Sequence, residues 1–200
     1  MTTLAVELRH FNAQFDRLLA FESSLADVSA AHQKLIAEVV FLRAFYVVEE
    51  SVKTSALKLL CGADYLDGSV PTLLHRSRSI SAAETAVANY GRPRPNFRAK
   101  WTNAVFVLQA IQHCMDPADH FVTALNTHAA LYEELRVIRN HIAHSTASTL
   151  TRYKAVVSRH YGAYKPIGPG TLLVSSRFAP LLLRMYLVSA RVMYRDLVKA

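Results

Sequence analysis

The chain has 200 residues, 52% of them hydrophobic, which suits one globular domain long enough to bury a core of its own. Charged residues interrupt both of its most hydrophobic segments, 35–48 and 178–193, so neither predicts a membrane span. The first ten residues include Glu7 and Arg9 and lack the apolar stretch of a signal peptide. We therefore expect a single cytoplasmic domain over residues 1–200, with no membrane partner.

Positive charge is concentrated in the second half of the chain. Residues 1–100 contain 12 Lys and Arg against 10 Asp and Glu, a net charge of +2, whereas residues 101–200 contain 11 against 5, a net of +6. From Arg136 onward there are eleven basic residues and one acid, Asp196. Such a one-signed region favours an anionic partner, nucleic acid ahead of a membrane surface. The alternative is a basic surface that only keeps the protein soluble.

Helical periodicity dominates the first half of the chain. Apolar residues recur at helical spacing over residues 3–22, and a long second helix is predicted over residues 29–60. Residues 61–98 then predict a long irregular insertion, because glycines and prolines interrupt the pattern. Within it, residues 81–90 predict a short helix. The segment 91–97 predicts an extended loop, either a solvated linker or a contact to phosphate.

The helical pattern resumes over residues 99–114. A further helix is predicted from Pro117 to about His144, with Asp116 as its N-cap. A short helix over residues 150–160 and a closing helix over residues 173–199 complete the chain. No strand pattern and no internal repeat is convincing. The sequence therefore predicts an all-α bundle of four or five main helices, with the insertion between the second and third.

The helix ending at His144 has two distinct faces at 100° per residue. One face forms an apolar stripe that we expect to pack in the core: Leu131, Leu135, Ile138 and Ile142. The opposite face carries polar residues at i, i+4 and i+8, which are Arg136, Asn140 and His144, with Arg139 and Ala143 beside them. We therefore expect this polar strip to face solvent or a second protein, which the small Ala143 allows to approach closely.

The spacing Arg139-Asn140-x-x-Ala143-His144 resembles the RNxxxH signature of the HEPN superfamily, small α-helical domains of which many are ribonucleases. The phrase "LRVIRNHIAHS" is most similar to the RiboL-PSP-HEPN branch and to HEPN domains of prokaryotic defence and toxin systems. The resemblance implies a HEPN-type bundle and a metal-independent endoribonuclease. It also implies a homodimer with a composite site, an antitoxin or sensor partner, and a role as a toxin or antiviral effector.

The residue types suit cleavage of RNA by its own 2′-hydroxyl, which needs a base, an acid and a cation over the phosphate charge. His144 is the candidate base or acid, because the imidazole of histidine titrates near neutral pH. Arg139 is the candidate phosphate ligand, and Asn140 can orient either the histidine or the phosphate. One chain supplies one signature histidine, so two chains would supply both. The alternative is the polar end of an ordinary helix, where cations complement the dipole.

Four further residues are candidate RNA contacts. Arg136 lies one turn before the motif and can contact the RNA backbone, or it can form a salt bridge with Glu133. Tyr153, Lys154 and Arg159 belong to a segment in which aromatic residues alternate with cations, a pattern suited to stacked bases. Its members are Tyr153, Tyr161 and Tyr164 among Arg152, Lys154, Arg159 and Lys165. Tyrosines packed at a dimer interface are the alternative for this segment.

HEPN domains often carry an acidic residue near the motif. By that resemblance Glu50, or its neighbour Glu49 in the same otherwise apolar helix, is the candidate that orients Arg139. A surface pairing of Glu49 with Lys53 is the alternative reading of this acidic pair.

No spacing of potential ligands predicts a metal site. Cys61 and Cys114 lie far apart, and we expect both to be reduced core thiols. His141 and His144 lack a third ligand at useful spacing. We therefore expect no metal and no cofactor, and the alternative to the nuclease is a non-catalytic helical module that binds RNA, a nucleotide or a protein.

Overall fold

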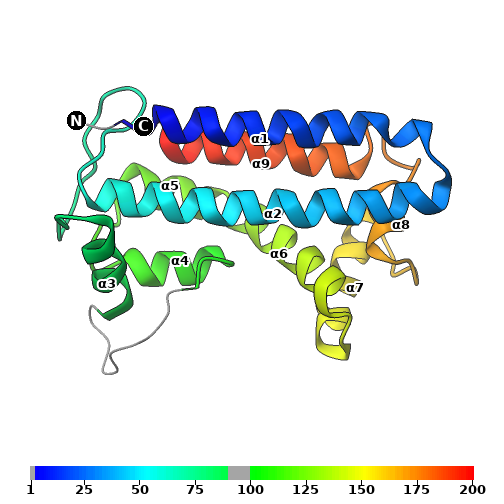
Figure 1. The fold of residues 1–200 in the computed structure, drawn as a ribbon. Coiled ribbons are helices and arrows are strands. Elements are labelled where there is room, and N and C mark those ends of the chain that lie inside the picture. Colours follow the sequence, from blue (N-terminus) through cyan, green and yellow to red (C-terminus); the bar gives the residue numbers. More distant parts are fainter. Residues whose placement is uncertain (1–2, 90–99) are drawn as a thin grey trace. The chain divides into compact units, whose positions relative to one another are not determined.

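The computed structural model describes residues 3–89 and 100–200, and within these ranges the chain is all-α, as predicted (Figure 1). The predicted loop 91–97 lies outside the described residues. The described part contains no strand. Its elements in chain order are α1 Ala5–Ser23, the 3-10 helix η1 Ser24–Asp27, α2 Ala30–Leu60, α3 Ile80–Asn89, α4 Ala104–Ile111, α5 His120–Thr127, α6 Ala129–His144, α7 Ala147–Tyr161, α8 Pro169–Leu173 and α9 Leu182–Val198.

The chain divides into two compact units, each assembled from segments that are distant in the sequence. The first unit comprises Met1–Asn12, Val48–Ala130 and Val192–Ala200, and the second comprises Ala13–Val47 and Leu131–Arg191. Helices α1, α2, α6 and α9 contribute residues to both units. None of the described helices combines the length and the hydropathy that a membrane crossing requires.

The helix predicted from Pro117 to His144 is two helices in the structure. Helix α5 begins at His120 because the Asp119 carboxylate, not that of Asp116, accepts the amide of Phe121 at 2.9 Å as N-cap. Asp119 is buried and also accepts hydrogen bonds from the Tyr65 hydroxyl and the Thr72 amide. These bonds compensate the burial of its charge. The predicted N-cap at Asp116 is therefore wrong by three residues.

His128 separates α5 from α6, with φ of −95° and ψ of 7°. Its Nε2 atom lies 2.9 Å from the Asp196 carboxylate, within the first unit. Helix α6 then starts afresh at Ala129. The closing helix is also shorter than predicted: α9 begins at Leu182, after the non-helical residues that include Pro180, rather than near residue 173.

The core of the second unit forms where α2, α6 and α9 bring aromatic rings together. Phe41 meets Tyr186 edge to face, with ring centroids 5.6 Å apart, and Phe45 lies 6.0 Å from Tyr132. Helix α6 buries Tyr132, Leu135, Val137 and Ile138 in this core. Of the predicted stripe, Leu135 and Ile138 are therefore confirmed as core residues. Leu131 and Ile142 are only half-buried, because the buried face is centred closer to Tyr132 and Val137.

Candidate functional site

A tight turn joins α6 to α7 and positions the motif residues. Helix α6 ends where Ser145 adopts φ of +42°, a left-handed conformation that few residues other than glycine adopt. The next residue, Thr146, starts α7 through a capping box with Thr149, in which each side chain accepts the backbone amide of the other. Helix α7 is 15 residues long and longer than predicted. The two helices therefore form a hairpin with a defined turn, within the second unit.

Arg139 and Asn140 form a bonded pair on α6. Arg139 Nη1 donates to Asn140 Oδ1 at 2.9 Å, and the guanidinium lies over the ring of Phe45, 5.8 Å from its centroid. Both side chains are half-buried. The bond fixes the orientation of the Asn140 amide, since its oxygen faces the arginine and its NH₂ group keeps two donors for another partner.

His144 occupies the last turn of α6 and is exposed, as is Ala143. Within residues 3–89 and 100–200, the imidazole of His144 makes no hydrogen bond, ion pair or ring contact. The motif cluster, which we define as Arg139, Asn140 and His144, therefore combines a half-buried pair with an exposed histidine one turn further along α6.

A depression of about 190 Å³ lies between α6 and α7, beside the motif cluster, and five residues line it: Val137, Asn140, Ser148, Thr149 and Arg152. Arg152 is exposed and forms no ion pair with any carboxylate among the described residues. The chain has no acidic residue between Glu134 and Asp196, so no carboxylate occurs on α7 or on the last two turns of α6. Apart from Val137, the depression is thus lined by hydrogen-bonding side chains, one of which is a cation.

The predicted RNA contacts differ in how accessible they are. Arg136 is 13% exposed and donates to the Glu133 carboxylate through Nε at 2.8 Å and through Nη2 at 2.5 Å. The salt bridge that was the alternative for Arg136 is therefore present. Lys154 is exposed and lies over the ring of Tyr164, 5.1 Å from its centroid. It is the only one of the four candidates that is exposed and carries no carboxylate partner among the described residues.

Tyr153 is 1% exposed, and its ring stacks on that of His141 with centroids 4.6 Å apart and an interplanar angle of 22°. Its ring faces are covered, so neither face of Tyr153 is open to an RNA base. His141 also bonds to the Thr149 hydroxyl through Nδ1, at 3.1 Å. Burial lowers the pKa of His141, and the nearby charge of Glu38 opposes this only in part. His141 thus has the structural role of holding α6 against α7.

Glu50, the candidate orienting acid, is an exposed residue of α2 in the first unit, whereas Arg139 belongs to the second. The ion pair that the structure gives Lys53 is with Glu84, at 2.9 Å, rather than with Glu49. Glu84 also raises the pKa of Lys53, chiefly through this hydrogen bond.

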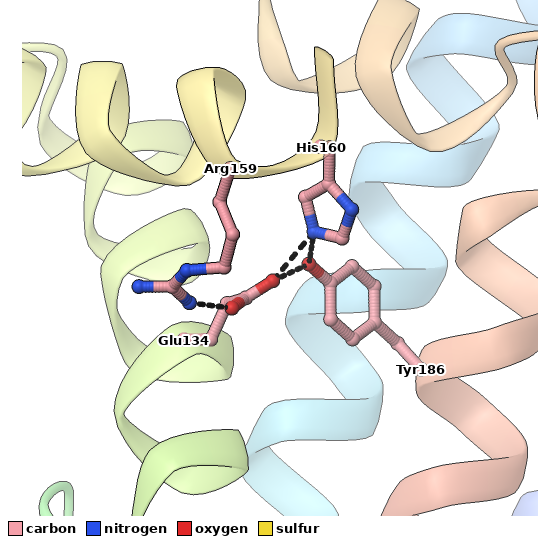
Figure 2. A network of polar contacts seen from close by, with 4 residues as sticks. All are labelled: Glu134, Arg159, His160 and Tyr186. Carbon is pink, nitrogen blue, oxygen red and sulfur yellow. Dashed lines mark hydrogen bonds and ion pairs between the residues drawn. The ribbon is translucent and has the colours of Figure 1, made fainter. Parts of the chain in front are cut away.

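A second polar cluster lies on the same hairpin, and we call its four residues the Glu134 network. Figure 2 shows the Glu134 carboxylate of α6 facing Arg159 and His160 of α7 and Tyr186 of α9. His160 Nε2 lies 2.6 Å from Glu134 Oε1 and 2.9 Å from the Tyr186 hydroxyl. The Tyr186 hydroxyl donates to Glu134, and Arg159 forms an ion pair with the same carboxylate.

The Glu134 network is largely shielded from water. The Glu134 side chain is 11% exposed and that of His160 is 21% exposed. Burial, followed by the charge of Glu134, raises the pKa of Tyr186 well above its ordinary value. Arg159, a predicted RNA contact, is thus held in an ion pair although its side chain is 61% exposed.

Glu134, His160 and Tyr186 were not predicted as site residues, although the position of Glu134 in the sequence carried a signal. This residue lies at i+3 from Leu131 and at i−4 from Ile138, so it interrupts the apolar stripe of α6. A lone carboxylate in such a stripe is expected to be paired when it is buried. Its partners are 26 and 52 residues further along the chain, which local spacing cannot identify.

Among the described residues, no group of three or more His, Cys, Asp or Glu side chains is arranged to hold a metal ion. Comparison of the chain with protein-family models, with curated proteins and with solved structures finds no match in any of the three. The similarity to the HEPN signature therefore depends on the motif residues of α6 alone.

Proposed function

We propose that the chain is a metal-independent endoribonuclease of the HEPN type. The observation that carries the proposal is the arrangement of the motif cluster. An arginine bonded to an asparagine precedes, by about one turn of α6, an exposed histidine with no partner among the described residues. The absence of acidic residues between Glu134 and Asp196 keeps this end of the hairpin positive, which favours an RNA phosphate.

The proposed reaction is a transesterification within the RNA. One histidine accepts the proton of a 2′-hydroxyl as its oxygen attacks the adjacent phosphorus, and the bond from phosphorus to the 5′-oxygen breaks. A second histidine donates a proton to the departing 5′-oxygen. Arg139 stabilises the negative charge that accumulates on the phosphate oxygens, and Asn140 holds that arginine in place. The products carry a 2′,3′-cyclic phosphate and a 5′-hydroxyl.

The two histidines come from two copies of the chain in this proposal. Each chain supplies one His144, and the exposed Ala143 beside it leaves room for a second backbone. A homodimer that brings two motif clusters together provides both acid and base around one phosphate. An antitoxin or sensor protein that controls the activity, and a role in defence, extend the proposal by the same resemblance.

Incubation of the purified protein with total RNA and with tRNA, in EDTA, tests the activity. We expect cleavage by the wild type that EDTA does not reduce, and a loss of about a thousandfold in His144→Ala, the scale of one general acid–base group. His32→Ala removes an exposed histidine of α2 outside the motif and serves as the matched control. Undiminished cleavage by His144→Ala would overturn the proposal, and RNA binding without cleavage by the wild type would favour the non-catalytic module.

The composite site has a separate test. Ala143→Cys, in a chain that also carries Cys61→Ser, places one new exposed thiol beside His144. If two motif clusters meet across a two-fold axis, mild oxidation will cross-link the protomers, and RNA fragments will cease to form. An active protein that stays monomeric at all concentrations would contradict the composite site.

A further inference from the structure

We propose that the depression between α6 and α7 binds a backbone phosphate of the RNA, with Arg152 as its principal ligand. The inference rests on the proposed function, because it gives the substrate a second anchor beside the motif cluster. In the sequence, Arg152 belongs to the basic, tyrosine-containing segment, and its spacing does not link it to the motif residues. The structure brings it to the same depression as Asn140, from the next helix.

The size of the depression suits a phosphate group rather than a whole nucleotide. Its volume is about 190 Å³. Pockets that enclose drug-sized ligands measure about 300–1,000 Å³, so a base and a sugar would extend beyond it. A tetrahedral phosphate can enter while the rest of the nucleotide stays outside, as expected for a contact along an RNA backbone.

The lining offers donors from three directions. Asn140 commits its oxygen to Arg139 and keeps its NH₂ donors, and Arg152 carries a forked guanidinium that matches phosphate oxygens. Ser148 has a hydroxyl that can rotate, since its contact with the Thr146 hydroxyl at 3.1 Å allows either atom to donate. Thr149 donates its hydroxyl proton to the backbone oxygen of Thr146, so this hydroxyl is not counted among the phosphate donors.

Electrostatics distinguishes Arg152 from two other arginines of the hairpin. Arg136 and Arg159 are each paired with a carboxylate, Glu133 and Glu134. Arg152 has no such partner among the described residues, and no carboxylate lines the depression. An anion that enters therefore meets an uncompensated cation without displacing an ion pair, which makes phosphate binding favourable.

Asn140 connects this depression to the motif cluster. One side of its amide faces Arg139, and the residue also lines the depression. A phosphate bound by Arg152 and Asn140 would lie beside the phosphate that Arg139 holds for cleavage. Arg152 would thus position the strand and would not touch the reacting atoms.

The test measures binding without cleavage. A fluorescent 2′-O-methyl RNA oligonucleotide cannot undergo attack by its 2′-oxygen, and its anisotropy reports affinity at several salt concentrations. For Arg152→Gln we expect an affinity loss of about tenfold, typical of one charge-assisted contact. The slope of log affinity against log salt should fall in magnitude by about 0.7, the value for one phosphate of a single strand.

Arg17→Gln is the matched control, because it removes the same charge from an exposed position on α1 of the same unit. It should bind within twofold of the wild type. Ser148→Ala should weaken binding less than Arg152→Gln does. Thermal unfolding of each variant checks that folding is unchanged, as expected for exposed side chains.

Equal binding by Arg152→Gln and Arg17→Gln would overturn the inference. Stronger competition by a poly-glutamate peptide than by unlabelled oligonucleotide would do the same, because it would identify an acidic protein as the ligand. If Arg152→Gln loses affinity while the wild type fails to cleave any RNA, the phosphate site stands and the nuclease proposal fails. The two hypotheses are therefore tested by separate readouts.

Discussion

The α6–α7 hairpin carries two polar clusters that differ in how completely their side chains are paired. In the Glu134 network, one carboxylate contacts an arginine, a histidine and a tyrosine, and most of these groups are shielded from water. In the motif cluster, Arg139 and Asn140 bond to each other, while His144 is exposed without a partner among the described residues. Both clusters contain a histidine and an arginine, so composition alone does not distinguish them.

From this difference we infer a structural role for the Glu134 network and a chemical role for the motif cluster. A buried charge that is fully paired holds the elements around it together, because the loss of one partner leaves the others unsatisfied. An exposed group with spare hydrogen-bonding capacity contributes little to stability and remains available to a ligand. We therefore expect substitutions in the Glu134 network to lower stability and substitutions in the motif cluster to lower activity.

The largest effect on stability is expected for Glu134→Ala. The substitution leaves His160 and Tyr186 without their shared acceptor, and the free energy of unfolding should fall by about 3 kcal/mol. Asp16→Ala is the control, since it breaks a more exposed pair, with Arg191, worth at most about 1 kcal/mol. Chemical denaturation measures both. Equal losses in the two variants would remove the distinction between the buried network and a surface pair.

Tyr186→Phe removes one hydroxyl from the same network. The ring keeps its packing against Phe41, but Glu134 loses one donor. We expect unfolding to become easier by about 1 kcal/mol, the usual net worth of one hydrogen bond. Denaturation curves measure this change. RNA binding at low temperature should stay at the wild-type level, and a large loss of binding would show that the network takes part in the site.

Tyr153→Phe should act in the opposite direction. The Tyr153 hydroxyl is buried without a hydrogen-bond partner among the described residues, and burial raises its pKa well above the ordinary value. Replacing an unsatisfied buried hydroxyl with hydrogen keeps the ring stacked on His141 and removes a desolvation penalty. The free energy of unfolding should therefore rise, by up to about 1 kcal/mol. A fall in the free energy of unfolding by more than about 1 kcal/mol would mean that the hydroxyl has a hydrogen-bond partner in solution.

The smallest effect concerns the pH dependence of stability through His141. Burial lowers its folded pKa below the ordinary value of 6.5, so the unfolded chain binds the proton more readily. The contribution of His141 to the free energy of unfolding is fully present above pH 6.5 and is lost as the pH falls below that value. Subtracting the stability profile of His141→Gln from that of the wild type isolates this contribution. A difference that does not change between neutral and acidic pH would contradict the burial of the ring.

Local pattern was sufficient to predict the all-α class, the positions of α1, α2 and α3, and the motif residues at the end of α6. It was not sufficient for the boundary at His128, where the apolar periodicity continues across the end of α5 and His128 contacts Asp196. Helix periodicity alone cannot reveal such a break, because α5 and α6 both present apolar residues.

The candidate site was predicted in part, for a physical reason. Arg139, Asn140 and His144 share one helix, so their spacing is visible in the sequence. Arg152 reaches the same region from another helix, and the partners of Glu134 come from two more, so only the folded chain brings them together. The ion pair of Arg136 with Glu133 was predictable as an alternative, since the two residues are three apart on one helix.

The most direct test of the contrast between the two clusters compares His144→Ala with Tyr186→Phe in two measurements. RNA cleavage is measured well below the melting temperature of either variant, and thermal unfolding gives the melting temperatures. We expect His144→Ala to lose cleavage by about a thousandfold with an unchanged melting temperature. We expect Tyr186→Phe to melt at a lower temperature but to cleave at the wild-type rate. Wild-type cleavage by His144→Ala, or a comparable loss of cleavage in the folded Tyr186→Phe protein, would contradict this contrast.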